Sequence, residues 1–257
     1  MSRKSERERT RLQKFQAMQA NKEAMEQDRP DYTGQWDLDW YKPNEHQSLI
    51  FECIDDEDVD VVLINAKSGS GKSTSAIWKA LSDVRKGKYK QVMFVKTPAE
   101  YGDDQIGFLS GDKDQKLEKH FEVMRGIFYD FMPKTKLITD EKKGVIKFNI
   151  PNFLAGATLY NTILIIDEAQ TMGPLTLKLL LERLGEGSKA FVLYDHDQCY
   201  SSKKRENGAK HLEDLVVERD NLDEVISVEE FFEYVEIPIS ANMRSRISRK
   251  VTELYSS

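Results

Sequence analysis

The sequence predicts an α/β fold, in which a mostly parallel β-sheet is covered by helices on both faces. Two observations lead to this prediction. Short runs of apolar, often β-branched residues recur along the chain, and they alternate with segments whose apolar residues follow helical spacing. Strands that are apolar on both faces are typical of a parallel sheet buried between two helical layers. With 257 residues, the chain suits one such domain with an extension.

The expected elements begin near residue 59. A buried strand is predicted over residues 59–64, and a Gly-rich turn and a helix over 73–85 follow it. The remaining predicted strands cover residues 91–95, 163–166 and 190–194, and the remaining helices cover 116–131 and about 175–184. Two short apolar runs, 137–138 and 145–148, flank a polar segment from Asp140 to Gly144, which predicts a β-hairpin.

The first 40 residues are expected to form a charged helical extension. Residues 3–14 carry six basic side chains against two acidic ones, and neither glycine nor proline occurs before Pro30. The apolar residues that fall on one helical face are Leu12, Phe15, Met18 and Met25. Two interpretations stay open: a solvated helix packed loosely on the domain, or a contact arm for a neighbouring subunit or nucleic acid. Residues 41–257 are expected to form the globular domain.

Composition and charge exclude some classes of protein. The formal net charge of −6 argues against a surface covered with nucleic acid, although it leaves room for a local basic groove. No apolar run reaches the roughly 20 residues that a membrane-spanning helix needs, and the charged N-terminus lacks the apolar core of a signal peptide. We therefore expect a cytoplasmic protein that does not enter a membrane.

The strongest motif is AKSGSGKS at residues 66–73, directly after the first predicted strand and at the start of a helix. This is the phosphate loop of nucleoside triphosphatases, with alanine in place of the usual first glycine. Gly69 and Gly71 let backbone amides turn toward phosphate oxygens. Lys72 can reach the β- and γ-phosphates, and the Ser73 hydroxyl can coordinate Mg²⁺. The residues expected to bind ATP are Ser68, Gly69, Ser70, Gly71, Lys72, Ser73 and Thr74.

A second motif places two carboxylates at the end of an apolar strand. The segment ILIIDEAQ at 163–170 delivers Asp167 and Glu168 at the strand's carboxyl end, where open α/β sheets bind ligands. Asp167 suits the Mg²⁺ shell, and Glu168 suits the orientation and deprotonation of an attacking water. Alone, the pair would be interpreted as solvated acids that cap a strand end. The phosphate loop earlier in the chain favours the catalytic interpretation, and glutamate as the second acid favours hydrolysis.

A third polar segment, YDHDQ at 194–198, follows the last predicted strand. We expect this strand to neighbour the one that carries Asp167. Gln198 could then sense the γ-phosphate and is assigned a catalytic role. Without that context the segment is only a polar turn, and His196 is interpreted as a surface turn residue.

Together these segments resemble the PhoH-like ATPases, a P-loop family with a RecA-like fold related to superfamily 1 helicases. The resemblance runs from about Tyr41 to Tyr255 and leaves the first 40 residues outside. It includes TPAE at 97–100 with IGFLSGD at 106–112, then DEAQ, GSK at 187–189, and Asp195 with Gln198. At the C-terminus, NMRS at 242–245 and VTELY at 251–255 resemble the family's closing helix.

The resemblance implies further roles. Gln47 stands where related ATPases place a glutamine that reads adenine, although it could be a polar residue on a helix surface. Arg244 stands where the family has an arginine finger or a γ-phosphate sensor, although it could be one of several basic residues on an exposed helix. The chain departs from the family at Thr97-Pro98, where an Arg-Pro pair is usual and Lys96 precedes, and at Tyr194-Asp195, where Gly-Asp is usual.

Several functions follow as expectations. About 60 residues come after Gln198, too few for a second RecA-like domain. An arginine finger acting in trans would then come from a neighbouring subunit, in a ring such as a hexamer.

The resemblance implies Mg²⁺-dependent ATP hydrolysis coupled to RNA or single-stranded DNA. The alternatives are an ATPase switch acting on a protein partner, a nucleotide-binding scaffold with little turnover, and a P-loop kinase. The sequence shows no obvious kinase lid.

Overall fold

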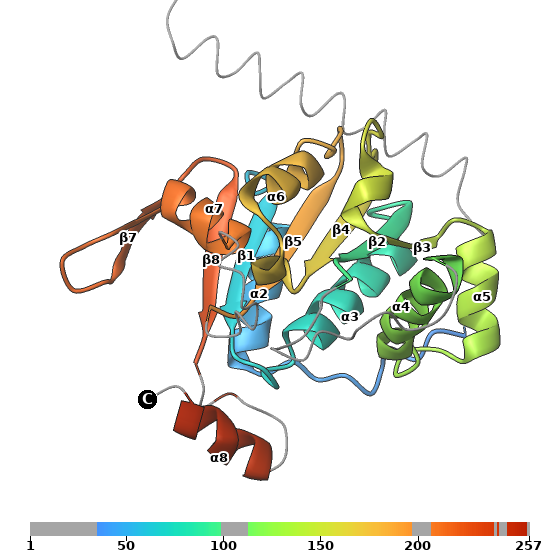
Figure 1. Ribbon diagram of the computed structural model, residues 1–257, viewed down its shortest axis with the longest axis horizontal. Helices are drawn as coiled ribbons and strands as arrows, with labels where there is room; N and C mark the ends of the chain where they lie inside the picture. The colour runs from blue at the N-terminus through green and yellow to red at the C-terminus, as the bar shows by residue number, and fades with distance from the viewer. Residues whose placement is uncertain (1–34, 99–112, 197–206, 239–240, 242–245, 256–257) are drawn as a thin grey trace, which may run out of the picture.

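The computed structural model describes residues 35–98, 113–196, 207–238, 241 and 246–255 (Figure 1). The helix expected within the first 40 residues falls almost wholly outside these ranges. The segment 106–112, Gln198 and Arg244 lie entirely outside them. Within the described residues, no helix is long and apolar enough to cross a membrane.

A six-stranded sheet forms the centre of the molecule, with the strand order β3-β2-β4-β5-β1-β8. Every pair of neighbouring strands in it is parallel. The strands are β1 (Val61–Ala66), β2 (Gln91–Lys96), β3 (Ile146–Asn149), β4 (Thr162–Asp167), β5 (Lys189–Tyr194) and β8 (Phe232–Ile237). This confirms the predicted α/β class, and β8 is a strand that the sequence analysis did not predict.

Helices cover both faces of the sheet. Alternate residues of the central strands enter two separate cores: Val62 and Ile64 of β1 face one layer, and Val61 and Leu63 face the other. The first layer consists of α2 (Glu45–Asp55), α3 (Lys72–Arg85), α4 (Lys113–Phe128) and α5 (Lys134–Lys142). The second layer contains η1 (Pro151–Leu154), η2 (Ala169–Thr171), α6 (Pro174–Leu181) and α7 (Gly208–Val216). The continuous apolar strands of the sequence therefore serve two cores.

The segment before residue 41 packs into the first of these cores. Trp36 and Leu38 are buried there. The Trp36 indole N–H donates to Asp140 Oδ2 at 2.7 Å, and Trp78 Nε1 donates to the carbonyl of Leu38 at 2.8 Å. Buried indole groups need such partners. The packed domain thus includes residues ahead of the boundary expected at residue 41.

The β-hairpin predicted over residues 137–148 is wrong. Residues Lys134–Lys142 form helix α5, and β3 pairs in parallel with β2. Within α5, Lys136 and Asp140 form a buried ion pair one helical turn apart. Gly144, interpreted as a hairpin turn, instead has a φ of 73° just after the helix, which is the left-handed conformation that commonly ends helices at glycine.

Two elements lie outside the two layers (Figure 1). Strands β6 (Val217–Arg219) and β7 (Val225–Val228) form an antiparallel hairpin after α7. The last helix, α8 (Arg246–Tyr255), exposes Ile247, Val251 and Leu254.

Candidate active site

The phosphate loop joins the end of β1 to the start of α3, as predicted. Gly69 and Gly71 have φ values of 85° and 81°, a region that side chains with a Cβ rarely adopt. Gly71 is the N-cap of α3. The first-turn amides of a helix have no carbonyl partner within the helix, so they can bind an anion. The two glycines therefore shape the turn that presents these amides.

Two side chains in the loop fit a phosphate ligand. Lys72 is 6% exposed, and its Nζ donates to the carbonyl of Ala66 at 3.2 Å. The Ser70 hydroxyl is buried and has no hydrogen-bond partner among the described residues. A buried polar atom without a partner costs about 1–3 kcal/mol, and a phosphate oxygen would remove that cost. Thr74 is half-buried in the first turn of α3.

Gln47 lies beside this loop. It sits in the first turn of α2, where Gln47 Oε1 accepts from the Asn44 amide at 3.0 Å and the Asn44 side chain accepts from the Gln47 amide at 2.9 Å. Its Nε2 donates to the carbonyl of Ser70 at 3.3 Å, and the side chain is 1% exposed. The interpretation of Gln47 as a polar residue on a helix surface is therefore wrong. Gln47 connects α2 to the phosphate loop.

Asp167 and Glu168 occupy the end of β4. Ser73 Oγ donates to Asp167 Oδ1 at 2.8 Å, which joins the helix after the phosphate loop to the acid of β4. Glu168 has a φ of 55°, a left-handed conformation that costs a non-glycine residue about 1–3 kcal/mol and often marks functional sites. Gln170 Nε2 donates to Glu168 Oε2 at 2.6 Å and holds the side chain.

Lys96 joins these carboxylates, a contact that the sequence analysis did not predict. It is the last residue of β2 and pairs in register with Asp167 on β4. Lys96 Nζ lies 2.9 Å from Asp167 Oδ2 and 3.8 Å from Glu168 Oε1. No local motif could have indicated this pair, because the two residues are far apart in sequence and meet only through strand order.

Asp195 ties the end of β5 to the same edge of the sheet. The predicted adjacency of β4 and β5 is confirmed. Asp195 Oδ2 accepts from the Ser68 amide at 2.9 Å, and Lys67 Nζ lies 3.8 Å from Asp195 Oδ1. The Asp195 amide donates to Gln170 Oε1 at 3.3 Å. The Ser68 amide thus already has a carboxylate partner, and Gln170 bridges the ends of β4 and β5.

Glu213 of α7 anchors the residues on either side of Asp195. It accepts hydrogen bonds from Tyr194 Oη at 2.7 Å and Arg219 at 3.0 Å, and its Oε2 lies 2.7 Å from His196 Nε2. Burial alone would raise the pKa of Glu213, but the hydrogen bonds from its partners outweigh burial and lower the pKa to about 2. His196 is half-buried and engaged with Glu213, so it is more than the surface turn residue expected.

The described residues offer few metal ligands at this edge. They contain no group of three or more His, Cys, Asp and Glu side chains that could hold a metal ion. Mg²⁺ usually takes only one or two carboxylates from a protein, together with substrate phosphates and water. Ser73 and Asp167, already in contact, match this requirement.

Gln198 and Arg244 lie outside the described residues. Their expected catalytic roles therefore stay predictions.

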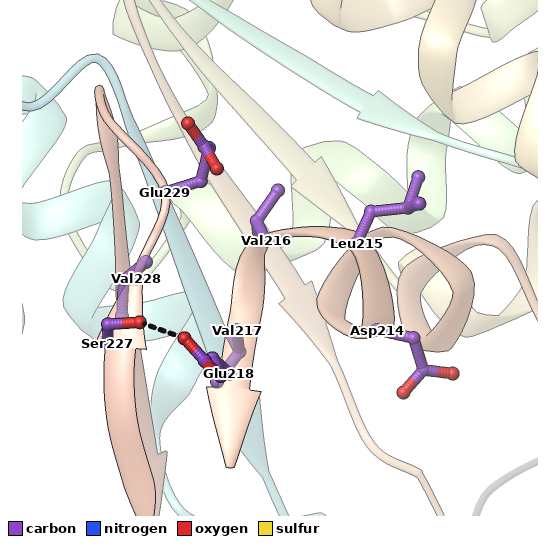
Figure 2. A pocket seen from close by; sticks show the side chains of 8 residues that line it. All are labelled: Asp214, Leu215, Val216, Val217, Glu218, Ser227, Val228 and Glu229. Carbon is purple, nitrogen blue, oxygen red and sulfur yellow. Dashed lines mark hydrogen bonds between the residues drawn. The ribbon is translucent and has the colours of Figure 1, made fainter.

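A separate cavity of about 400 Å³ lies between the end of α7 and the β6–β7 hairpin (Figure 2). Its lining includes Leu215, Glu218 and Ser227, and Ser227 Oγ donates to Glu218 Oε2 at 2.9 Å. None of its lining residues belongs to the phosphate loop or to the ends of β2, β4 and β5. The cavity is therefore distinct from the candidate active site.

Comparison with known proteins agrees with this geometry. The family model described as PhoH-like protein matches residues 41–256. A PhoH-like protein of Bacillus subtilis (strain 168) is 28% identical over 149 residues, covering 58% of this chain and 46% of that protein. A PhoH-like protein of Synechocystis is 31% identical over 139 residues, covering 54% and 42%. Protein PhoH2 of B. subtilis is 29% identical over 160 residues, covering 60% and 36%. Each match therefore spans less than half of the relative's length.

Taken with the phosphate loop and the acids of β4, the family match shows that the chain belongs to the PhoH-like protein family, a family of nucleotide-binding P-loop proteins.

Proposed function

We propose that this protein hydrolyses ATP in a Mg²⁺-dependent reaction. The observation that carries the proposal is the 2.8 Å hydrogen bond from Ser73 Oγ to Asp167 Oδ1. It joins the two protein groups that P-loop ATPases use to hold the metal, and it does so next to an anion-binding helix N-terminus. The buried Ser70 hydroxyl, which has no partner among the described residues, supports a phosphate ligand in the same loop.

Each residue has a chemical task in this reaction. Lys72 is placed to bind the β- and γ-phosphates of the substrate, and Ser73 and Asp167 would hold Mg²⁺. When bound, the metal neutralises charge that develops on the phosphate oxygens. Glu168 is suited to orient the attacking water and to accept its proton. Gln170 restrains Glu168 through a 2.6 Å hydrogen bond. Glutamate at this position favours water over a small-molecule acceptor.

The coupling of hydrolysis to RNA or single-stranded DNA is part of the proposal, with a protein partner and a low-turnover scaffold as its alternatives. Family likeness and the basic segment at residues 3–14 support the coupling to nucleic acid. The sequence analysis placed Lys96 next to the Thr97-Pro98 pair, where nucleic-acid contact was in question. Lys96 contacts Asp167 and so gives no support for nucleic-acid binding. Self-association in a ring such as a hexamer would supply Arg244 in trans, and an arginine finger is worth about 10³–10⁵ in rate.

Release of inorganic phosphate tests these proposals together. We expect wild-type turnover that requires Mg²⁺, rises with added single-stranded RNA or DNA, and rises more than proportionally with protein concentration. Lys72→Ala is the matched control, because it removes the phosphate contact and should abolish productive ATP binding. Absence of phosphate release under every condition would support the scaffold. Turnover without nucleic-acid stimulation would support the protein-partner switch, and strictly proportional turnover down to dissociated monomer would reject the finger in trans.

A further inference from the structure

Lys96 occupies a position that the proposed reaction leaves unexplained. The ammonium group is 2.9 Å from Asp167 Oδ2, and the Lys96 and Asp167 side chains are only 13% and 2% exposed. Register fixes the contact, since Lys96 and Asp167 stand opposite each other on neighbouring strands. His120 Nε2 donates to the backbone carbonyl of Lys96 at 3.1 Å. His120 therefore holds the backbone of Lys96 at the end of β2, while the Lys96 side chain contacts the carboxylates of the site.

Both carboxylate oxygens of Asp167 already have a donor. Ser73 Oγ donates to Oδ1, and Lys96 Nζ donates to Oδ2. The two donors differ in what they can do when a metal enters. A hydroxyl keeps lone pairs, so Ser73 can remain next to Asp167 and coordinate the metal itself. An ammonium group has three donors and no lone pair, so Lys96 can only compete with a cation for Oδ2.

We propose that Lys96 is a resident counter-ion of the site, which neutralises Asp167 in the nucleotide-free protein and releases it when the metal binds. The inference rests on the proposed Mg²⁺-dependent function and deepens it, because it makes Lys96 a positioning residue that sets how much metal the protein needs. Releasing Asp167 does not require Lys96 to leave the site. Its Nζ is already 3.8 Å from Glu168 Oε1, so the lysine can remain paired with that carboxylate.

A purely structural ion pair makes a different prediction. Removing one partner of a buried pair destabilises a protein because the other charge is left uncompensated. If Lys96 had only this structural role, its removal would lower stability without a specific change in metal affinity. If Lys96 also competes with the metal for Asp167, its presence lowers metal affinity, and the competition depends on its charge. Lys96→Arg should therefore retain wild-type metal affinity, whereas Lys96→Met should bind the metal more tightly.

The experiment is a titration of the full chain with Mn²⁺ alone, with the free metal followed by electron paramagnetic resonance. Unit charges about 4 Å apart attract by about 1 kcal/mol in water, which corresponds to about a fivefold change in affinity. We expect Lys96→Met to bind Mn²⁺ at least about fivefold more tightly than wild type. Lys88→Met is the control, because Lys88 pairs with Asp55 at 2.6 Å beyond the other end of α3. It should leave Mn²⁺ affinity unchanged.

The outcomes separate this inference from the proposed function. Tighter Mn²⁺ binding by Lys96→Met supports the counter-ion even if wild type releases no phosphate from ATP. Equal Mn²⁺ affinity in wild type and folded Lys96→Met overturns the counter-ion, whether or not ATP is hydrolysed, and so does undetectable binding in both. Lys96→Gln keeps a hydrogen-bond donor without the charge, so it serves if Lys96→Met does not fold. A wild-type affinity in Lys96→Gln would equally overturn the inference.

Discussion

The contacts of Glu213 lead to a prediction about stability and pH. The Glu213 side chain is 3% exposed and binds Tyr194, His196 and Arg219. Glu213→Gln keeps the size of the side chain and removes its charge. We expect the variant to unfold more easily at neutral pH, because Arg219 loses its buried anionic partner and the end of β5 loses its anchor.

The magnitude follows from the pKa of Glu213. A decrease from 4.5 to about 2 sets a ceiling of about 3.4 kcal/mol for the stabilisation by the ionised carboxyl. Arg219 and His196 are partly in contact with water, with exposures of 20% and 24%. Solvent screening therefore reduces the expected value to about 2 kcal/mol. A carboxyl whose pKa is lowered by folding stabilises the protein above its unfolded pKa. That stabilisation is lost as the pH falls from about 4.5 toward 2.

Urea unfolding followed by circular dichroism between pH 7 and pH 3 measures this effect. The free energy of unfolding should differ by about 2 kcal/mol between wild type and Glu213→Gln at pH 7, and the difference should shrink below pH 4.5. Asp214→Asn is a matched control, since Asp214 is 59% exposed and pairs with Lys210 on the surface. It should cost less than about 1 kcal/mol. If wild type and Glu213→Gln lose stability in parallel across this pH range, the assigned role of Glu213 is incorrect.

Two further variants test the fold around the site. Trp36→Phe removes the indole hydrogen bond to Asp140 and should lower the free energy of unfolding by about 1.5–3 kcal/mol, the range for hydrogen bonds to charged groups. An unchanged urea midpoint would show that the segment before residue 41 is not part of the cooperative domain. Gln47→Ala removes the contact with Ser70 and should weaken binding of a fluorescent ATP analogue about tenfold, or 1.4 kcal/mol. Competition with GTP then checks adenine reading, which an unchanged preference for ATP over GTP would contradict.

Short sequence patterns predicted those parts of the molecule whose conformation is set by neighbouring residues in the chain. Strand β1, the phosphate loop and the start of α3 lie within one short segment, where the glycine spacing dictates the backbone conformation. Asp167 and Glu168 at the end of β4 were predicted because acids at the carboxyl end of an apolar strand lie where open α/β sheets bind ligands. The adjacency of β4 and β5 was expected from the resemblance to RecA-like proteins and not from a local pattern.

Contacts between distant segments could not be predicted in the same way. Lys96 meets Asp167 only because β2 and β4 are neighbours in register, and one sequence does not give strand order. Gly144 was ambiguous, because a glycine that ends a helix and a glycine in a hairpin turn both favour positive φ. Gln170 was part of a recognised motif, but its bridge to Asp195 depends on the adjacency of two strand ends.

The most direct test of the central claim compares ATP binding and ATP turnover in Glu168→Gln. The proposed role of Glu168 is confined to the attacking water. The variant should bind a fluorescent ATP analogue as tightly as wild type and release phosphate about 10²–10⁴-fold more slowly. Phosphate release at the wild-type rate, from a variant that binds ATP normally, would contradict the assignment of Glu168 as the residue that activates water.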